Sequence, residues 1–327
     1  WGAGWGANPG GGPDFLTGAV RADNGGGLNG ISALGARAST MHTSSGRGRR
    51  VARRVVEVTL PDGADDAVWP LLGWLAGKAS PDRVPLLLGL EGASPSGDDL
   101  KALCAAFGTT SGAAMLHIRG VTPEGGLEAS DDAVRVSIGP EDFADAWREL
   151  NSGEEAVELV AIGSPHVSID EVRSLAGLLE GREISAAVDV IVTIGREVLA
   201  LARSEGVVNE LERQGVRFLP DICWCSITEP LFPSATKVLM TNSGKYAHYA
   251  FGLSGRQVRF GGLGACVEAA VSGRVSLEPQ NWITSSRCQS SLCRACGYGQ
   301  EPDRDRHFRR WVFRQFRRRG SVRRRCR

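Results

Sequence analysis

Three short stretches in the second half of the chain hold the side chains best suited to chemistry. Asp221-Ile-Cys-Trp-Cys225 places two cysteines two positions apart, and residues 260–266 end at Cys266. Residues 241–249 read Thr-Asn-Ser-Gly-Lys-Tyr-Ala-His-Tyr, which combines small polar groups with a lysine and a histidine. Thiolates are the ligands that a soft metal site requires, and an ammonium group beside free backbone N–H groups binds a carboxylate. These residue types therefore suit a metal site beside a site for a small acid.

Each of these stretches follows a short apolar run that is typical of a β-strand. Strands and helices alternate over this half of the chain, which predicts parallel βαβ units. In an open α/β sheet, ligands bind outside the carboxyl ends of the strands. We therefore expect the three stretches to meet at one edge of a sheet, together with the strand-exit segment Gly163-Ser-Pro-His166.

The hydrophobic pattern predicts an α/β fold between residues 51 and 275. We divide this region into a first lobe, residues 51–152, and a second lobe, residues 153–275, which carries the site loops. The predicted strands cover residues 55–60, 83–90, 115–118, 155–162, 187–194, 216–220, 237–240 and 257–260. The predicted helices cover residues 67–79, 98–107, 141–150, 169–180, 196–214, 245–250 and 265–271. Asp98 is a suitable N-cap, and residues 121–135 are polar enough to form a loop.

The two ends of the chain differ from this pattern. Residues 1–50 contain fourteen Gly and no apolar periodicity, so they lack the apolar surface that a folded unit needs. Residues 276–327 form an Arg-rich irregular tail. Within this tail, residues 301–327 hold twelve Arg and three acidic residues, so their net charge is +9. The net charge of the whole chain is +1, so residues 1–300 carry a net charge of −8. One hypothesis is that both flanks are frameshifted, that is, translated out of frame.

The tail offers two alternative functions. Cys288-x4-Cys293-x2-Cys296, followed by Cys326, has the spacing that begins a plant-type [2Fe–2S] site. The alternative to an enzyme is a non-catalytic protein whose basic tail binds nucleic acid. The tail resembles no nucleic-acid-binding module, so we do not expect nucleic acid as a partner. No apolar run approaches the length of a membrane span, and no basic region precedes an apolar core at the N-terminus. We expect a cytoplasmic protein without a membrane partner.

The three stretches resemble the aconitase X family of dehydratases, which includes cis-3-hydroxy-proline dehydratases and archaeal phosphomevalonate dehydratases. The resemblance continues over roughly residues 51–275 in the family's order. The further matching segments are Leu72-Gly-Trp-Leu-Ala-Gly77, Asp98-Asp-Leu-Lys-Ala-Leu103, Trp147-Arg-Glu-Leu-Asn-Ser152, Gly163-Ser-Pro-His166 and Gly255 to Ala269. The block at residues 241–249, combined with the Cys-Trp-Cys block, is the most specific part of the match.

This resemblance implies the α/β catalytic region of the aconitase superfamily, with parallel or mixed sheets in three-layer lobes. It implies elimination of water from a small hydroxy acid, with cis-3-hydroxy-L-proline as the first candidate. An iron–sulfur cluster, [2Fe–2S] or [4Fe–4S], is the expected Lewis acid. Cys223 and Cys266 match positions expected to bind it, and Cys225 is either a further ligand or a buried structural thiol. The family's third ligand and its swivelling domain or small subunit, which carries a serine base, have no counterpart in the matching region.

The candidate site residues follow from their chemistry and their position. The expected catalytic residues are Ser164, His166, Lys245 and His248, and the expected substrate-binding residues are Thr110, Ser111, His117, Asn242, Ser243 and Arg256. Lys245 adds positive charge at a strand-to-helix junction, where free N–H groups bind anions. Structural roles are equally open for several candidates: helix capping by Asn242 or Ser243, a surface ion pair for Arg256, and a core position for Cys266.

Overall fold

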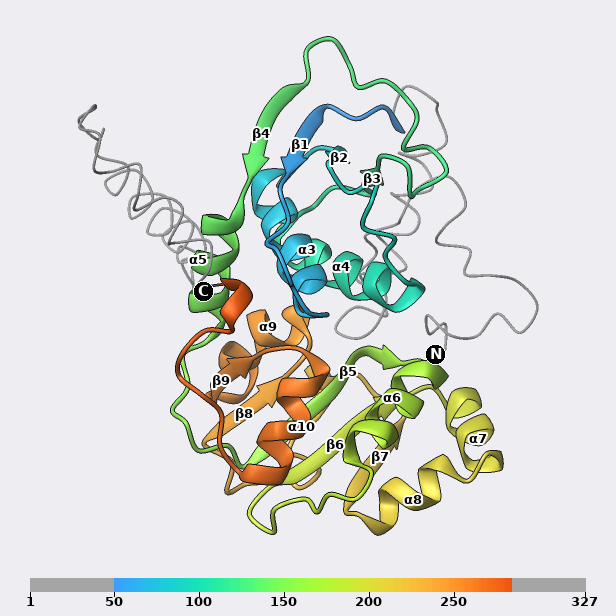
Figure 1. Ribbon diagram of the computed structural model, residues 1–327, viewed down its shortest axis with the longest axis vertical. Coiled ribbons are helices and arrows are strands. Elements are labelled where there is room, and N and C mark those ends of the chain that lie inside the picture. Colours follow the sequence, from blue (N-terminus) through green and yellow to red (C-terminus); the bar gives the residue numbers. More distant parts are fainter. Residues whose placement is uncertain (1–49, 284–327) are drawn as a thin grey trace, which may run out of the picture. The chain divides into compact units, whose positions relative to one another are not determined.

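The computed structural model of this protein describes residues 50–283 (Figure 1). Two separate β-sheets lie between Arg54 and Ile138 and between Leu159 and Phe260, so the prediction of an α/β fold is confirmed. The predictions made for the Gly-rich segment 1–49 and for the tail 284–327, including its cysteine spacing and its nucleic-acid alternative, lie outside the described residues. No helix in the described region has the length and apolar content required to cross a bilayer.

The first sheet has the strand order β3-β2-β1-β4, and every neighbouring pair is parallel. Its strands are β1 (Arg54–Val58), β2 (Pro85–Leu88), β3 (His117–Ile118) and β4 (Val134–Ile138). Its helices are α3 (Val68–Ala79), α4 (Gly97–Thr110) and α5 (Pro140–Leu150). A Cβ on Gly73 would lie 2.0 Å from the carbonyl oxygen of Leu103. Glycine at position 73 therefore lets α3 and α4 pack backbone to backbone.

The second sheet has the order β7-β6-β5-β8-β9 and is also wholly parallel. Its strands are β5 (Leu159–Val167), β6 (Asp189–Ile194), β7 (Val216–Pro220), β8 (Val238–Thr241) and β9 (Gln257–Phe260). Its helices are α6 (Ile169–Leu179), α7 (Arg196–Ser204), α8 (Val207–Arg213), α9 (Gly244–Ser254) and α10 (Leu263–Ser272). Strand order reverses at β5, so the carboxyl ends of β5 and β8 flank a topological switch point, where α/β sheets bind ligands.

Both faces of the second sheet are buried, as its nearly continuous apolar strands predict. In β5, Leu159 and Ala161 belong to one core, whereas Val160 and Ile162 belong to another. The core that contains Val160 includes residues of α6, α8 and α10. The core that contains Leu159 extends through α9 to α3, α4 and the first sheet. One hydrophobic core therefore joins the first lobe to one face of the second sheet.

Three local predictions differ from the structure. Residues 134–138 form β4, which the sequence pattern does not predict because this edge strand is largely exposed and carries polar residues. The helix predicted over residues 196–214 breaks at Gly206, which has a left-handed φ of 81°. The N-cap of α4 is Ser96 instead of Asp98, and the Ser96 hydroxyl accepts from the Asp99 N–H at 3.1 Å. Asp98 is engaged elsewhere, as described below.

Candidate functional site

The site begins with a pair of cysteines that follows β7 at the carboxyl edge of the second sheet. Cys223 precedes the short helix η2 (Trp224–Ser226), and its sulfur accepts hydrogen bonds from the thiol and the backbone N–H of Cys225. The intervening Trp224 is buried, and its indole N–H donates to the carbonyl oxygen of Ile162 at 2.8 Å. This hydrogen bond holds the cysteine loop against β5, next to the switch point.

The two thiols hold their protons very differently. A hydrogen bond from Cys225, together with nearby Lys245 and His166, lowers the pKa of Cys223 to about 6 although burial opposes the shift. The same hydrogen bond, reinforced by burial, raises the pKa of Cys225. The arrangement therefore favours a thiolate on Cys223 and a protonated thiol on Cys225. A thiolate is the form that binds a soft metal ion.

The amino-terminal end of α9 lies beside this pair. Ser243 caps the helix, because its hydroxyl accepts from the Tyr246 N–H at 3.0 Å and donates to the carbonyl oxygen of Ser164. Lys245 is buried in the first turn and lies close enough to both cysteines to favour their thiolate forms. Tyr246 packs against Trp224 with 5.1 Å between the ring centroids. The 241–249 block and the Cys-Trp-Cys block therefore meet at one edge of the sheet.

The end of β5 completes this edge. Gly163 has a φ of 102°, and a Cβ there would lie 2.3 Å from the carbonyl oxygen of Thr193, so only glycine fits. Ser164 is 4% exposed, and within the described residues its hydroxyl has no hydrogen-bond partner. His166 Nε2 lies 2.8 Å from the carbonyl oxygen of Ile222, which connects this segment to the cysteine loop. The segment belongs to β5 itself rather than to an exit loop, and the strand's pairing with β6 shifts register within it.

A small pocket lies where β5, α9, α4 and α6 meet. It is lined by Lys101, Ala102, Gly163, Ser164, Pro165, Glu171, Asn242, Ser243 and Gly244. Its volume of about 20 Å³ is enough for one water molecule or one small group of a ligand. The structure therefore places the predicted residues Ser164, Asn242 and Ser243 around one polar pocket at the switch point.

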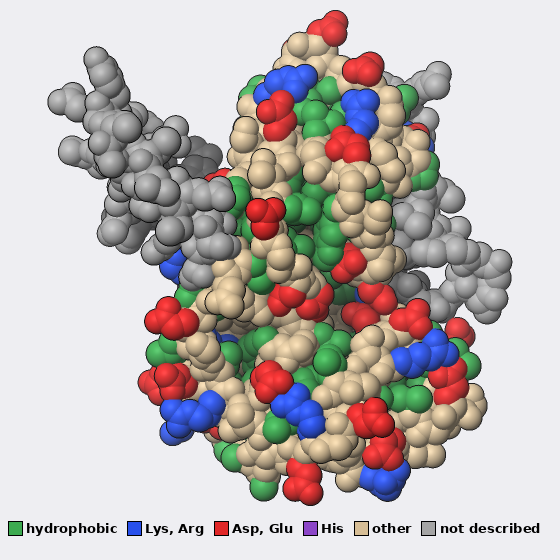
Figure 2. All heavy atoms as spheres, viewed as in Figure 1, with side chains coloured by type: hydrophobic (Ala, Val, Ile, Leu, Met, Phe, Trp, Pro, Cys, Tyr) green, Lys and Arg blue, Asp and Glu red, His purple; other side chains and the backbone are tan. Residues whose placement is uncertain are grey.

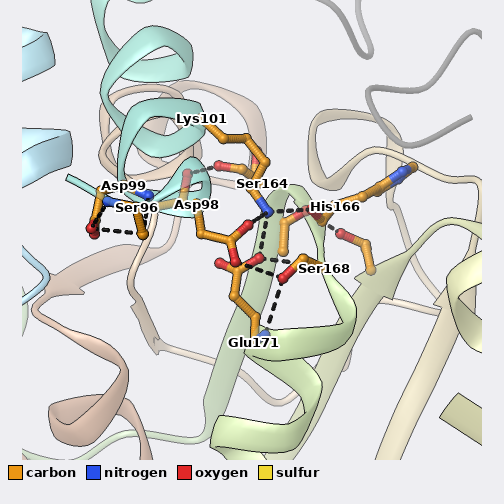
Figure 3. Close-up of polar contacts among 11 residues, drawn as sticks. Ser96, Asp98, Asp99, Lys101, Ser164, His166, Ser168 and Glu171 are labelled. Atoms are coloured by element: carbon orange, nitrogen blue, oxygen red, sulfur yellow. Dashed lines mark hydrogen bonds and ion pairs between the residues drawn. The ribbon is translucent and has the colours of Figure 1, made fainter. Parts of the chain in front are cut away.

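Three charged residues that were not among the sequence-based candidates lie beside the pocket (Figure 3). Lys101 on α4 forms an ion pair with Asp98, 2.7 Å from Nζ to Oδ1, and another with Glu171 on α6. Its ammonium group also donates to the carbonyl oxygen of His166 at 3.1 Å. Ser168 donates through its hydroxyl to Asp98 Oδ2 at 2.6 Å. This cluster, named the Lys101 cluster below, ties α4 to the β5–α6 segment.

Part of the Lys101 cluster is predictable from the sequence. Asp98 and Lys101 are three positions apart, so they face the same side of a helix. Ser168 and Glu171 have the spacing of a capping box, and both of its hydrogen bonds are present at the start of α6. Local patterns do not reveal that the two pairs meet, because Asp98 and Ser168 are 70 positions apart and belong to different lobes.

Cys266 lies in the core on one face of the second sheet. It is fully buried in α10, and burial, reinforced by nearby Asp66, raises the pKa of its thiol well above the ordinary value. Within residues 50–283, no three His, Cys, Asp or Glu side chains are grouped as metal ligands. Cys266 packs as a core residue, and the joint role of Cys223, Cys225 and Cys266 as metal ligands stays a prediction.

Thr110 and Ser111 lie at the opposite end of α4 from Lys101. The Thr110 hydroxyl donates to the carbonyl oxygen of Trp74 at 2.9 Å, and the Ser111 hydroxyl donates to that of Ser80 at 2.5 Å. Both hydroxyls therefore hold α4 against α3 and the residue that follows it. The structure does not bring either of these predicted substrate-binding residues to the pocket.

Three further candidates also lie away from the pocket lining. His117 is buried at the edge of the first sheet, where Nε2 lies 2.6 Å from a backbone carbonyl oxygen and burial lowers its pKa. Arg256 precedes β9, at the amino edge of the second sheet, and pairs with Glu229 at 3.3 Å. His248 on α9 accepts from the indole N–H of Trp74 at 3.2 Å, and burial lowers its pKa. The predicted residues that do gather around the switch point are Cys223, Cys225, Ser164, His166, Asn242, Ser243 and Lys245.

Comparison with protein families gives two adjacent matches. The model of the aconitase X second domain matches residues 52–148, and that of the aconitase X third domain matches residues 157–272. The gap between the matches falls between the two sheets. Both sheets are therefore covered by models of one family.

Two curated relatives are named for two different dehydratase activities. A cis-3-hydroxy-L-proline dehydratase from Pseudomonas aeruginosa is 45% identical over 242 residues, which are 72% of this chain and 42% of that protein. The phosphomevalonate dehydratase large subunit of Methanocaldococcus jannaschii is 30% identical over 200 residues, which are 61% of this chain and 49% of that protein. The chain thus spans less than half of the length of either relative.

The arrangement of the elements also has a counterpart among solved structures. The crystal structure of the holo-form of aconitase X from Thermococcus kodakaraensis matches this chain with a TM-score of 0.61 and 28% sequence identity. The match covers 68% of this chain and 56% of the other. The similarity seen in sequence therefore extends to the fold.

Proposed function

Because this chain belongs to the aconitase X family, we propose that it forms part of a hydro-lyase that eliminates water from a small hydroxy acid. cis-3-Hydroxy-L-proline is the first candidate substrate, since the dehydratase named for it is 45% identical over 72% of this chain. Phosphomevalonate is the second candidate, supported by a lower identity of 30%. The chain spans 42% and 49% of these two relatives, so the proposed activity is that of an assembly to which the chain contributes.

The observation that carries this proposal is a hydrogen-bonded cysteine pair next to a helix end that suits a carboxylate. Dehydration needs an electrophile for the leaving hydroxyl, a base for the carbon-bound proton and donors for the substrate carboxylate. The hydrogen bond from Cys225 lowers the pKa of Cys223, and Lys245 lies buried near it. The N–H groups at the start of α9 add the positive end of a helix dipole. This combination suits a negatively charged hydroxy acid beside a metal centre.

The proposed cofactor is an iron–sulfur cluster of the [2Fe–2S] or [4Fe–4S] type. Cys223 and Cys225 would hold it, because their sulfurs are in hydrogen-bond contact and their surroundings lower the pKa of Cys223. A cluster held there would supply a Lewis acid for the substrate hydroxyl. No third ligand joins these two cysteines within residues 50–283, so we propose that the remaining ligand comes from outside this range.

The chain's own residues would bind and orient the acid. Asn242 and the helix end capped by Ser243 line the pocket and suit the carboxylate, whose charge Lys245 would balance. The buried Ser164 hydroxyl, which lacks a partner among the described residues, is placed to hydrogen-bond the same group. His166 donates through Nε2 to a backbone carbonyl oxygen, so its Nδ1 is the nitrogen that can accept a proton.

We also propose that a swivelling domain or a small subunit completes the enzyme and supplies the base. The Methanocaldococcus jannaschii relative is named a large subunit, which supports a small-subunit partner. A reducing cytoplasm is the proposed location. The described cysteines are free thiols, which suits that compartment.

Iron loading tests this proposal directly. After anaerobic reconstitution with iron and sulfide, we expect the full-length chain to retain iron and to show sulfide-to-iron absorption, and Cys223→Ser to lose most of both. Cys104→Ser changes a buried thiol on α4 and serves as the matched control, which should load like the wild type. A wild-type chain that stays free of iron, or equal iron contents in the wild type and Cys223→Ser, would contradict an iron–sulfur cluster at this site.

A further inference from the structure

The last residues of β5 are held by side chains rather than by neighbouring strands. β6 pairs with residues 159–162 and again with Val167, and β8 pairs with residues 159–161, so residues 163–166 lie outside this pairing. Backbone carbonyl oxygens that leave a ladder need other donors. Side chains of three elements supply them: Thr193 of β6 donates to Gly163, Ser243 at the start of α9 donates to Ser164, and Lys101 of α4 donates to His166. Lys101 is the donor that comes from the first lobe.

Lys101 is fully engaged with protein atoms. Its three ammonium protons go to Asp98 at 2.7 Å, to Glu171, and to the carbonyl oxygen of His166 at 3.1 Å (Figure 3). Burial lowers the pKa of Lys101, but the charges of Glu171 and Asp98 outweigh burial and raise it, so the group keeps its protons. Figure 2 shows further acidic side chains where the two lobes meet. Lys101 therefore acts through its protein partners, although it lines the pocket.

The His166 ring carries this contact on to the cysteine loop. Its Nε2 donates to the carbonyl oxygen of Ile222 at 2.8 Å, and Ile222 directly precedes Cys223. The indole N–H of Trp224 makes a second contact with β5, at the carbonyl oxygen of Ile162, in the regular part of the strand. The contact nearest to Cys223 is therefore made by the part of β5 that strand pairing does not hold.

We propose that Lys101 is a positioning residue for the cysteine loop: it fixes the backbone of His166, and the His166 ring fixes the backbone that leads into Cys223. A cation on α4, in the first lobe, thereby aligns a loop at the edge of the second sheet. This inference rests on the proposed function, because the aligned cysteines are the proposed metal ligands. Contacts behind the ligands of a metal site orient those ligands in the same way.

A double variant separates positioning from charge balance. Lys101→Met alone would also leave Asp98 and Glu171 without a cation. Lys101→Met combined with Asp98→Asn removes one positive and one negative charge, so the net charge of the cluster stays that of the wild type. Asp98→Asn alone is the matched control, because it has the same change at position 98 and keeps the donor to His166. The double variant is therefore compared with both chains.

Two measurements on the iron-free, full-length chain report the two steps of the proposal. Long-range proton–nitrogen NMR of histidine at alkaline pH shows which ring nitrogen of His166 carries the proton, with His166→Gln to assign its signals. Amide hydrogen exchange followed by mass spectrometry reports the opening of the cysteine loop, residues 221–227. The strand β6, a buried part of the same sheet, serves as the internal reference for opening of the whole fold.

We expect the wild type and Asp98→Asn to hold the His166 proton on Nε2. In the double variant we expect both tautomers, and exchange in residues 221–227 should accelerate at least about tenfold more than exchange in β6. A single tautomer in the double variant would overturn the proposal. Exchange that stays unchanged in residues 221–227, or that rises equally in β6, would overturn it too, since Lys101 would then have only a structural role.

These measurements need no iron, so they separate this inference from the proposed function. A chain that loads iron but shows no dependence on Lys101 keeps the proposed hydro-lyase function and loses the positioning role. A chain that shows this dependence but stays iron-free after reconstitution keeps the link between Lys101 and the loop and loses the proposed cluster.

Discussion

Cys223 owes its pKa of about 6 to groups that can be removed one at a time. The hydrogen bond from the Cys225 thiol is the largest of them, and Lys245 adds its charge. Cys225→Ala removes the hydrogen bond and leaves Lys245 in place, so we expect the pKa of Cys223 to rise toward that of an ordinary thiol. Alkylation rates measured for the Cys223 peptide should reach half of their maximum near pH 6 in the wild type and at higher pH in the variant. Coincident curves would contradict this account.

Asp66 gives the protein a pH dependence of stability. Burial raises its pKa, although the Leu263 N–H donates to Oδ2 at 2.8 Å and opposes the rise. A carboxyl group whose pKa is higher in the folded state stabilises the protein most when protonated, and that contribution is lost as pH rises through the folded pKa. Asp66→Asn removes the titration and keeps an oxygen for Leu263. Relative to the wild type, the variant should gain stability between acidic and neutral pH in denaturant titrations, and a constant difference would exclude this effect.

Among the elements, the break between α7 and α8 depends on one residue. Gly206 has a φ of 81°, and a Cβ there would contact nothing within 4 Å, so the cost of a side chain is conformational. Gly206→Ala should lower the free energy of unfolding by about 1 kcal/mol. Gly177, inside α6, is equally open, so Gly177→Ala should raise it by roughly 0.5–1 kcal/mol. Denaturant midpoints that shift in the same direction for both variants would show that the left-handed conformation is not the cause.

Elements were predictable where burial dominates. The strands β6 and β8 lie inside the second sheet and are almost wholly buried, and their ends fall within two residues of the predicted bounds, because parallel strands inside a sheet are apolar runs between turns. β4 was missed since its side chains are mostly exposed, and residues 196–214 read as one helix because Gly206 interrupts otherwise strong helix formers. In such cases the neighbouring elements decide the structure, and local periodicity contains little information about them.

The candidate site was also predictable only in part. Cys223, Ser243 and Lys245 were found because each follows a strand, and parallel strands end at a common edge. The contact between Lys101 and Glu171 was not found, since it depends on how two lobes pack. The family resemblance places Cys266 in the site, whereas local patterns do not show that it also packs in the core around α10.

At the scale of the whole molecule, Lys101 is a cation that connects the two lobes. Lys101→Met would leave Asp98 and Glu171 without their shared partner, which should cost roughly 3 kcal/mol of unfolding free energy or more. The exposed pair of Arg135 and Glu57 provides the control, because Arg135→Met should change stability very little. Thermal or denaturant unfolding measures both. Similar losses in the two variants would show that the Lys101 cluster is no stronger than a surface ion pair.

Two glycines in the pocket lining lie against main-chain atoms of other elements. A Cβ on Gly163 would lie 2.3 Å from the Thr193 carbonyl oxygen, and one on Gly244 would lie 3.0 Å from that of Pro70. A side chain at Gly163 would clash with the main chain, and one at Gly244 would require Pro70 to move by a few tenths of an ångström, so the backbone around the pocket restricts both positions. Proteins that share this scaffold should therefore vary what they accept through the other side chains that line the pocket.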